Sequence, residues 1–171
     1  RYLIVVDMQN DFVTGSLGSK MAEMIVPAVC EKNTQLQGQG STVFMTLDTH
    51  FKDYLEKPEG KKLPVEHCIK GTELQPETQV AEAIGGSAEV YEKSTFGSAE
   101  LAQHLAEITK AGDEIELCGL CTDICVVSNA LLIKMLFPEC EVIVDARLRR
   151  SNRGKPQGGT CYNGVMSVQD R

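Results

Sequence analysis

One stretch of the sequence constrains the fold more than any other: the run Glu114–Val127, which reads EIELCGLCTDICVV. Its first residues predict a short buried strand, and Gly119 predicts a turn after it. The apolar positions from Ile124 onward predict a helix, capped at its start by Thr122 or Asp123. A buried strand that leads through a glycine turn into a helix is typical of α/β proteins.

This junction places Cys125 in the first turn of the predicted helix. Unpaired backbone N–H groups and the positive end of the helix dipole favour a thiolate there, so Cys125 is a candidate nucleophile. A cysteine in an apolar segment is alternatively inert core packing. Cys118 and Cys121 also form a CxxC motif. No second CxxC or HxxxH follows at zinc-finger spacing, so a thiol redox or non-catalytic binding protein is the alternative of another class.

Strand and helix alternate along most of the chain. Short apolar runs predict strands, and longer segments with apolar residues on one face predict helices. The predicted strands are 2–6, 41–47, 90–91, 114–118 and 142–144, and the predicted helices are 20–35, 99–110 and the one after Gly119. In a chain of 171 residues, this predicts an α/β fold. We expect one doubly wound domain with a mostly parallel central sheet and helices on both faces.

The composition narrows the functional classes. The net charge of −7 argues against nucleic acid as a partner. No apolar run approaches the roughly 20 residues of a membrane span, and the opening apolar segment is too short for the core of a signal peptide. The seven cysteines are an odd number without framework spacing. We therefore expect reduced thiols in a cytoplasmic protein that does not bind membranes.

Four potential metal ligands follow the second predicted strand. Asp48 and His50 come directly after it, and Glu59 and His67 lie in the segment 49–74, which is rich in Lys, Pro and Gly. These side chains are donors that a divalent metal accepts, and a loop this long is uncommon unless it is functional. A solvated loop with incidental histidines is the alternative. The sequence therefore predicts a candidate metal site.

Two further residues occupy positions suited to catalysis. The first predicted strand ends at Asp7, which places this carboxylate at the edge where open α/β sheets gather their active sites. A turn or helix-capping aspartate is the alternative. Lys93 follows the third predicted strand, although most lysines are surface groups that maintain solubility.

Three stretches together resemble a known family. They are DMQNDF from Asp7, EKSTFGS around Lys93 and GLCTDICV around Cys125. In order and spacing they resemble the signature stretches of the isochorismatase-like cysteine hydrolases, over about residues 2–146. The resemblance implies a Rossmann-like three-layer fold and a catalytic triad of Asp7, Lys93 and Cys125.

The resemblance also implies a mechanism. Cys125 would attack an amide carbonyl to give a thioester, while Asp7 takes the thiol proton and passes it to the leaving ammonia. Lys93 would stabilise both anions. Backbone N–H groups of Cys121 and Cys125 would form the oxyanion hole, with a cis peptide between Leu120 and Cys121.

Among these hydrolases, the sequence is most similar to the metal-dependent nicotinamidases. The similarity implies that Asp48, His50, Glu59 and His67 hold one divalent metal ion, most simply zinc, with iron and manganese as alternatives. Phe12 would form one wall for a pyridine ring. We therefore expect hydrolysis of nicotinamide or a close heteroaromatic amide, as in NAD salvage. Another small amide, carbamoyl or ureido substrate is the alternative. Relatives commonly self-associate, which leaves a homo-oligomer open.

The sequence departs from this pattern in two places. The position three residues before His67, often Trp or Phe in nicotinamidases, is Pro64, and the chain has no Trp. Residues 147–171 carry six Lys or Arg and one acidic residue, with no apolar periodicity. Read one base later from Leu148, codons compatible with this tail can encode residues that resemble the closing turn and helix of the family. We therefore divide the chain into a hydrolase domain, 1–146, and an anomalous basic tail, 147–171, interpreted as a frame-shifted version of that turn and helix.

Overall fold

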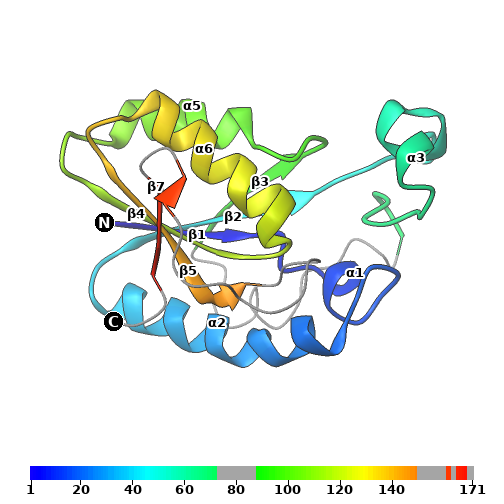
Figure 1. Ribbon diagram of the computed structural model, residues 1–171, viewed down its shortest axis with the longest axis horizontal. Coiled ribbons are helices and arrows are strands. Elements are labelled where there is room, and N and C mark those ends of the chain that lie inside the picture. Colours follow the sequence, from blue (N-terminus) through cyan, green and yellow to red (C-terminus); the bar gives the residue numbers. More distant parts are fainter. Residues whose placement is uncertain (73–87, 150–160, 163–164, 169–171) are drawn as a thin grey trace.

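A sheet with helices on both faces organises the chain. The computed structural model describes residues 1–72, 88–149, 161–162 and 165–168 (Figure 1). In the described residues the strands lie in the order β3-β2-β1-β4-β5-β7-β6. Neighbouring strands from β3 to β7 pair in parallel, and β6 pairs antiparallel with β7. The strands are β1 (Tyr2–Val6), β2 (Thr42–Asp48), β3 (Glu89–Lys93), β4 (Glu114–Gly119), β5 (Glu141–Arg149), β6 (Cys161–Tyr162) and β7 (Val165–Val168).

The helices lie on opposite faces of this sheet. Helix α2 covers one face, and α5 and α6 cover the other (Figure 1). This arrangement confirms the predicted doubly wound α/β domain. Among the described helices, none is long and apolar enough to cross a membrane. The helices are α1 (Asn10–Val13), α2 (Lys20–Gly38), α3 (Pro58–Lys62), α5 (Ala99–Ile108) and α6 (Val127–Leu136), with a 3₁₀ turn at Tyr54–Glu56 and a π-helical turn at Thr122–Val126.

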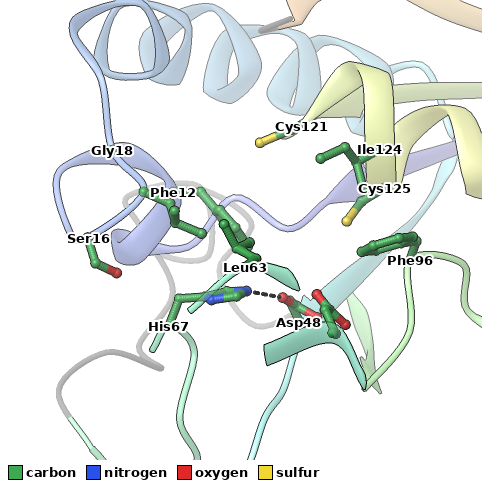
Figure 2. A pocket seen from close by; sticks show the side chains of 12 residues that line it. Phe12, Ser16, Gly18, Asp48, Leu63, His67, Phe96, Cys121, Ile124 and Cys125 are labelled. Carbon is green, nitrogen blue, oxygen red and sulfur yellow. Dashed lines mark ion pairs between the residues drawn. The ribbon is translucent and has the colours of Figure 1, made fainter. Parts of the chain in front are cut away.

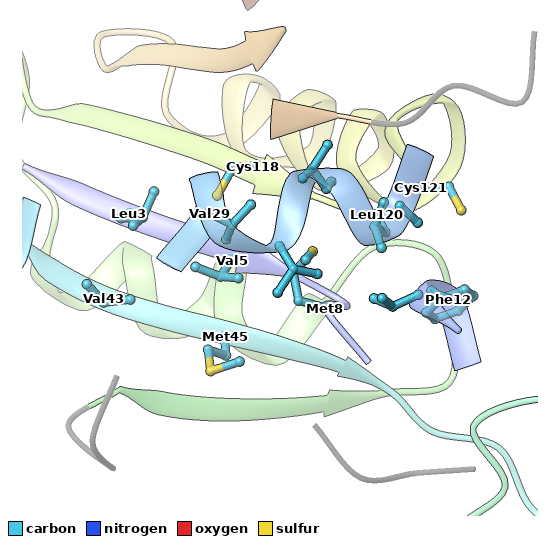
Figure 3. Packing of buried hydrophobic residues seen from close by; sticks show 14 of the residues in the cluster. Leu3, Val5, Met8, Phe12, Val29, Val43, Met45, Cys118, Leu120 and Cys121 are labelled. Carbon is cyan, nitrogen blue, oxygen red and sulfur yellow. The ribbon is translucent and has the colours of Figure 1, made fainter. Parts of the chain in front are cut away.

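Strand β1 explains why the sheet has a core on each side. Successive side chains of a strand point to opposite faces. Leu3 and Val5 therefore pack with α2 residues such as Val29 (Figure 3), whereas Ile4 and Val6 pack in the cluster that contains residues of α5 and α6. Because both faces are buried, β1 reads as a continuous apolar run, which is typical of a central parallel strand.

The helix boundaries confirm some sequence predictions and correct others. Ser98 caps α5, since its hydroxyl accepts a hydrogen bond from the backbone N–H of Leu101 at 3.2 Å. The expectation that Thr122 or Asp123 caps the helix after β4 was wrong. The π-helical turn already begins at Thr122, so both residues lie inside it. Their backbone follows the wide turn instead of the extended conformation that a cap requires.

The predicted boundary at residue 146 does not coincide with the end of a strand. Strand β5 continues to Arg149, and β6 and β7 lie within the stretch 147–171. Strand β7 pairs with β5 through Ile143 and Met166. The rest of this stretch lies outside the described residues.

A buried group of charges joins α2 to the sheet. The ammonium of Lys32 lies 2.7 Å from the Asp145 carboxylate, and it also contacts the Glu116 carboxylate. Arg1 reaches the same Glu116 at 3.2 Å. Burial opposes the charge of Lys32, but the two carboxylates outweigh it and raise the Lys32 pKa. The stability that Lys32 contributes is therefore fully present at neutral pH. It is lost only as the pH rises above the ordinary lysine pKa of 10.5.

Replacing Lys32 with methionine is expected to destabilise the fold. The Glu116 and Asp145 carboxylates would remain buried without their main counter-ion, at a cost on the order of 3 kcal/mol. Urea unfolding at neutral pH measures the change. Lys20→Met is the matched control, because Lys20 is an exposed lysine of the same helix and should cost less than about 0.5 kcal/mol. Equal losses in the two variants would contradict the expectation.

Candidate active site

The sheet topology brings distant residues to one edge. Asp7 follows β1, Asp48 and Lys93 end β2 and β3, and Cys125 lies in the π-helical turn after β4. Strand β1 pairs in parallel with both β2 and β4, and β2 pairs with β3 so that Asp48 lies opposite Lys93. Because parallel strands end on the same side, all four side chains meet at the carboxyl edge of the sheet.

Asp7, Lys93 and Cys125 form a contiguous buried group. The Lys93 ammonium lies 2.6 Å from Asp7 Oδ2 and 3.6 Å from Cys125 Sγ. Thr46 donates a hydrogen bond from its hydroxyl to Asp7 Oδ1 at 2.6 Å. Asp7 has no exposed surface, and Lys93 and Cys125 are each 6% exposed. The structure therefore brings the three predicted triad residues into contact in an almost fully buried position.

The surroundings set the protonation states of this group. Burial raises the pKa of Cys125 well above its ordinary value, and the nearby Asp7 carboxylate adds to this effect. The Lys93 ammonium lowers the Cys125 pKa, but by less. Burial also raises the pKa of Asp7, again opposed by Lys93. Burial disfavours the charge of Lys93, but Asp7 outweighs it and raises the Lys93 pKa. The expectation that the helix start favours a thiolate was therefore wrong. The resting group holds a neutral Cys125 thiol beside the Lys93 ammonium.

A second group of donors lies next to the first. Asp48 Oδ2 lies 3.1 Å from His50 Nε2 and 3.4 Å from His67 Nε2. Ligand bonds of about 2.0–2.2 Å in a tetrahedral zinc site separate the donors by roughly 3.3 Å. His67 Nδ1 lies 2.7 Å from the Val65 carbonyl oxygen, which leaves Nε2 facing the other donors. These three residues therefore fit one metal ion.

Two electrostatic features support this fit. Burial opposes ionisation of Asp48, but His50, His67 and Lys93 outweigh it and hold the Asp48 pKa well below its ordinary value. Asp48 is thus an anion that a cation would stabilise. Within the described chain, the buried Nε2 of His50 has no hydrogen-bond partner of suitable geometry. Such an atom is costly unless a ligand satisfies it.

Glu59, the fourth predicted ligand, lies at the border of this group. It belongs to α3, and its Oε1 is 3.9 Å from His50 Nε2. The three mutually close donors are Asp48, His50 and His67, without Glu59. Its role as a ligand stays a prediction.

Residues of the triad and of the donor group line one cavity of about 340 Å³. Cys125 lines one part of it, Asp48 and His67 line another, and Phe12 lies on the wall, where the sequence predicted a ring contact (Figure 2). The full lining is Phe12, Ser16, Leu17, Gly18, Asp48, Glu59, Leu63, His67, Phe96, Cys121, Ile124 and Cys125. Mostly apolar walls around a few polar groups are typical of a site for a small organic molecule.

Sequence reasoning missed several residues that shape this site. Leu63, Phe96 and Ile124 form apolar walls of the cavity. Asn129 ties two site segments together, because its side-chain amide donates to the carbonyl oxygens of Cys125 and Phe96 at 2.8 and 3.1 Å. Phe96 lies inside the EKSTFGS motif, which was a usable signal. Nothing in the local sequence around Asn129 distinguishes it from an ordinary helix residue.

The CxxC pair does not form a redox unit in this structure. Cys118 is fully buried in the core, whereas Cys121 lines the cavity. Neither cysteine is part of a disulfide, and burial raises the pKa of Cys118. A buried thiol that resists ionisation is unreactive. The peptide between Leu120 and Cys121 is cis, as the resemblance implied.

Comparison with known proteins agrees with these features. The Isochorismatase domain matches residues 1–153. The chain belongs to the isochorismatase family. A relative described as an uncharacterized isochorismatase family protein, PncA of Bacillus subtilis, is 33% identical over 147 residues, and the match covers 75% of this chain and 75% of that one. The protein is thus a hydrolase of the isochorismatase family.

Solved structures of isochorismatase relatives share its fold. The pyrazinamidase/nicotinamidase of Streptococcus mutans has a TM-score of 0.77 and 26% identity, over 88% of this chain and 87% of that one. The pyrazinamidase of Pyrococcus horikoshii, solved in complex with zinc, has a TM-score of 0.75 and 23% identity, over 99% and 98% of the two chains.

Proposed function

We propose that this isochorismatase-family hydrolase is a cysteine amidase that converts nicotinamide, or a close heteroaromatic amide, to the acid and ammonia. One observation carries the proposal: a buried group of thiol, ammonium and carboxylate lies next to three donors that fit a metal ion, and Cys125, Asp48 and His67 line the same cavity. The similarity to a pyrazinamidase/nicotinamidase supports the choice of substrate. A free thiol and a small soluble substrate suit the reducing cytoplasm, and NAD salvage would be the corresponding role.

Asp7, Lys93 and Cys125 each have a role in the proposed reaction. Asp7 takes the thiol proton, and Cys125 Sγ attacks the amide carbonyl to form a tetrahedral oxyanion. Backbone N–H groups of Cys121 and Cys125 would hold that oxyanion. Asp7 then gives the proton to the amide nitrogen, the C–N bond breaks, and ammonia leaves a thioester. Lys93 keeps Asp7 ionised before the attack. A water then hydrolyses the thioester to the acid and the free thiol.

A divalent metal ion completes the proposed site. Asp48, His50 and His67 would hold it, with Glu59 as the further predicted ligand. Zinc is the simplest choice, because the relative from Pyrococcus horikoshii was solved with zinc. Iron and manganese accept the same donors. When bound, the ion would supply Lewis-acid chemistry at the end of the cavity that Asp48 and His67 line, and would help to orient the substrate toward Cys125.

The cavity walls favour a flat apolar ring. Phe12 and Ile124 line the same space as Cys125 (Figure 2), and Phe96 also belongs to the lining. A substitution in the same region favours a second candidate. Pro64 occupies the position where nicotinamidases often have Trp or Phe, and its neighbour Leu63 lines the cavity. A wall without that aromatic ring also suits a non-aromatic amide, carbamoyl or ureido substrate, which the same triad would hydrolyse.

An amide panel tests the proposal. Purified protein is stripped with a chelator, reloaded with zinc, iron or manganese, and assayed for ammonia release. We expect nicotinamide or pyrazinamide to be hydrolysed fastest. We also expect chelation to lower the rate at least tenfold and metal to restore it. Hydrolysis of carbamoyl compounds without that of heteroaromatic amides would replace the first candidate with the second.

Loss of a metal ligand should remove both the ion and the activity. His50→Ala takes away one donor without touching Lys93, so we expect zinc affinity and amide hydrolysis to fall together by on the order of 100-fold or more. Chelator competition measures the affinity, and ammonia release measures the rate. His104→Ala is the matched control, since His104 lies on α5, away from the cavity. Full activity in metal-free His50→Ala would contradict a role for the ion.

A further inference from the structure

Two buried polar side chains follow Asp7, and the proposed reaction does not use them. Gln9 has no exposed surface, and Asp11 is 1% exposed. Gln9 lies directly before α1, and Asp11 lies in the first turn of α1. Burying polar groups is costly unless each finds partners. The partners of these two side chains are backbone groups of the segments that carry the metal donors.

Gln9 holds the backbone on both sides of Asp48. Its Nε2 donates to the Asp48 carbonyl oxygen at 2.9 Å, and its Oε1 accepts from the Asp48 N–H at 2.7 Å. This pair of bonds resembles the exchange between two residues of adjacent strands. Strand β1 ends at Val6, so the Gln9 amide continues the pairing along β2 beyond the last residue of β1.

Asp11 holds the other ligand segment. Its Oδ2 accepts a hydrogen bond from the backbone N–H of Cys68 at 2.6 Å, and Cys68 directly follows His67. An ionised acceptor makes this bond stronger than one between neutral groups. Cys68 has a φ of 48°, a conformation that most residues with a side chain avoid. The Asp11 bond therefore restrains a backbone position that local preference would not hold.

We propose that Gln9 and Asp11 are positioning residues that fix the donors of Asp48 and His67 at the separation one metal ion requires. The two donors come from different segments, yet residues 9 and 11 hold the backbone at or next to both of them. Displacement of either segment would spread the donors, which lie 3.4 Å apart. This inference rests on the metal site of the proposed function, but not on the identity of the amide.

A glycine offers an independent way to move the Asp11 carboxylate. A Cβ atom added at Gly15 would lie 2.4 Å from Asp11 Oδ1 and 2.7 Å from Asp11 Cα. These distances are too short for non-bonded atoms, so Gly15→Ala must shift Asp11 while leaving its carboxylate chemically intact. The effect of this substitution therefore reports on position alone.

Zinc affinity, measured by competition with a chromophoric chelator, tests the inference without any amide. We expect Asp11→Ala, Gln9→Leu and Gly15→Ala to bind zinc about 10- to 100-fold more weakly than the unaltered chain. Asp11→Asn keeps an acceptor oxygen and should recover part of the loss. Val29→Ala is the control for stability. Val29 belongs to the core under α2 and neither lines the cavity nor belongs to the donor group. Its truncation should therefore lower the unfolding temperature but leave zinc affinity unchanged.

The zinc measurements distinguish a failure of the positioning role from the absence of a metal site. Circular dichroism shows which variants are folded. If Asp11→Ala does not fold, Asp11→Asn and Gly15→Ala decide. Zinc affinities within twofold of the unaltered chain in the folded variants would overturn the inference, and so would an equal loss in Val29→Ala. Failure of the unaltered chain to bind zinc would remove the metal site of the proposed function, and the inference with it.

Discussion

Replacing Cys125 with alanine is expected to abolish amide hydrolysis, with kcat lowered by roughly 10⁴-fold or more. Alanine has no atom that can form the thioester, so a bound amide would meet only water. The fold should survive, because Cys125 is a small side chain whose methyl-sized replacement leaves only a small gap beside Lys93. Ammonia release from nicotinamide under zinc-loaded conditions measures the rate, and circular dichroism checks the fold.

Cys118→Ala is the matched control for this change. Cys118 is also buried, but it lies in the core and not in the cavity. Its replacement should leave the rate within about threefold at a modest cost in stability. Activity that survives Cys125→Ala would end the assignment of the nucleophile. Loss of activity in folded Cys118→Ala would contradict the purely structural role of Cys118.

Replacing Asp7 with asparagine should lower kcat by about 10²- to 10⁴-fold, the usual contribution of a general base. The raised pKa of Cys125 means that the thiol is protonated at neutral pH, so attack requires a proton acceptor. Asparagine cannot accept that proton, although it nearly matches the shape of aspartate. The rate profile against pH, measured in ammonia-release assays, is the decisive readout.

The rate of hydrolysis should depend on pH through the ionisation of Asp7. Asp7 must be ionised to act, so the rate should fall as the pH drops through its raised pKa. This acidic limb should be absent from Asp7→Asn. Thr46 donates a hydrogen bond to Asp7 and so lowers its pKa. Thr46→Val should therefore move the limb to higher pH, and Thr46→Ser should restore it. A limb that stays in place in all three variants would exclude Asp7 as the base.

The origin of residues 147–171 is a separate question. The Isochorismatase domain match ends at residue 153, so most of this stretch lies outside it. We propose that the stretch is a frame-shifted version of the closing turn and helix. Sequencing the gene from independent clones tests this directly. An unbroken reading frame through codon 148 would rule the frame shift out.

Much of the fold was predictable from the sequence because its causes are local. Strand β1 is apolar throughout, since both of its faces are buried, and α5 begins where Ser98 can cap it. The three signature stretches contain Asp7, Lys93 and Cys125, which the structure brings together. The three mutually close donors Asp48, His50 and His67 were predicted separately, from the segment that follows the second predicted strand. Motif spacing carries this information because Asp7 follows a strand of the parallel sheet and Asp48 and Lys93 end two others.

Tertiary structure alone decided the chemistry of the site. The sequence pointed to a thiolate at Cys125 from the helix start, a local effect, whereas burial beside Asp7 keeps the thiol protonated. The tie between Gln9 and Asp48 and the wall formed by Leu63 were likewise not predicted. Each depends on side chains brought together from segments far apart in the chain. Desolvation and through-space charge act over a few ångströms in the folded protein, and the linear sequence does not encode those distances in any local pattern.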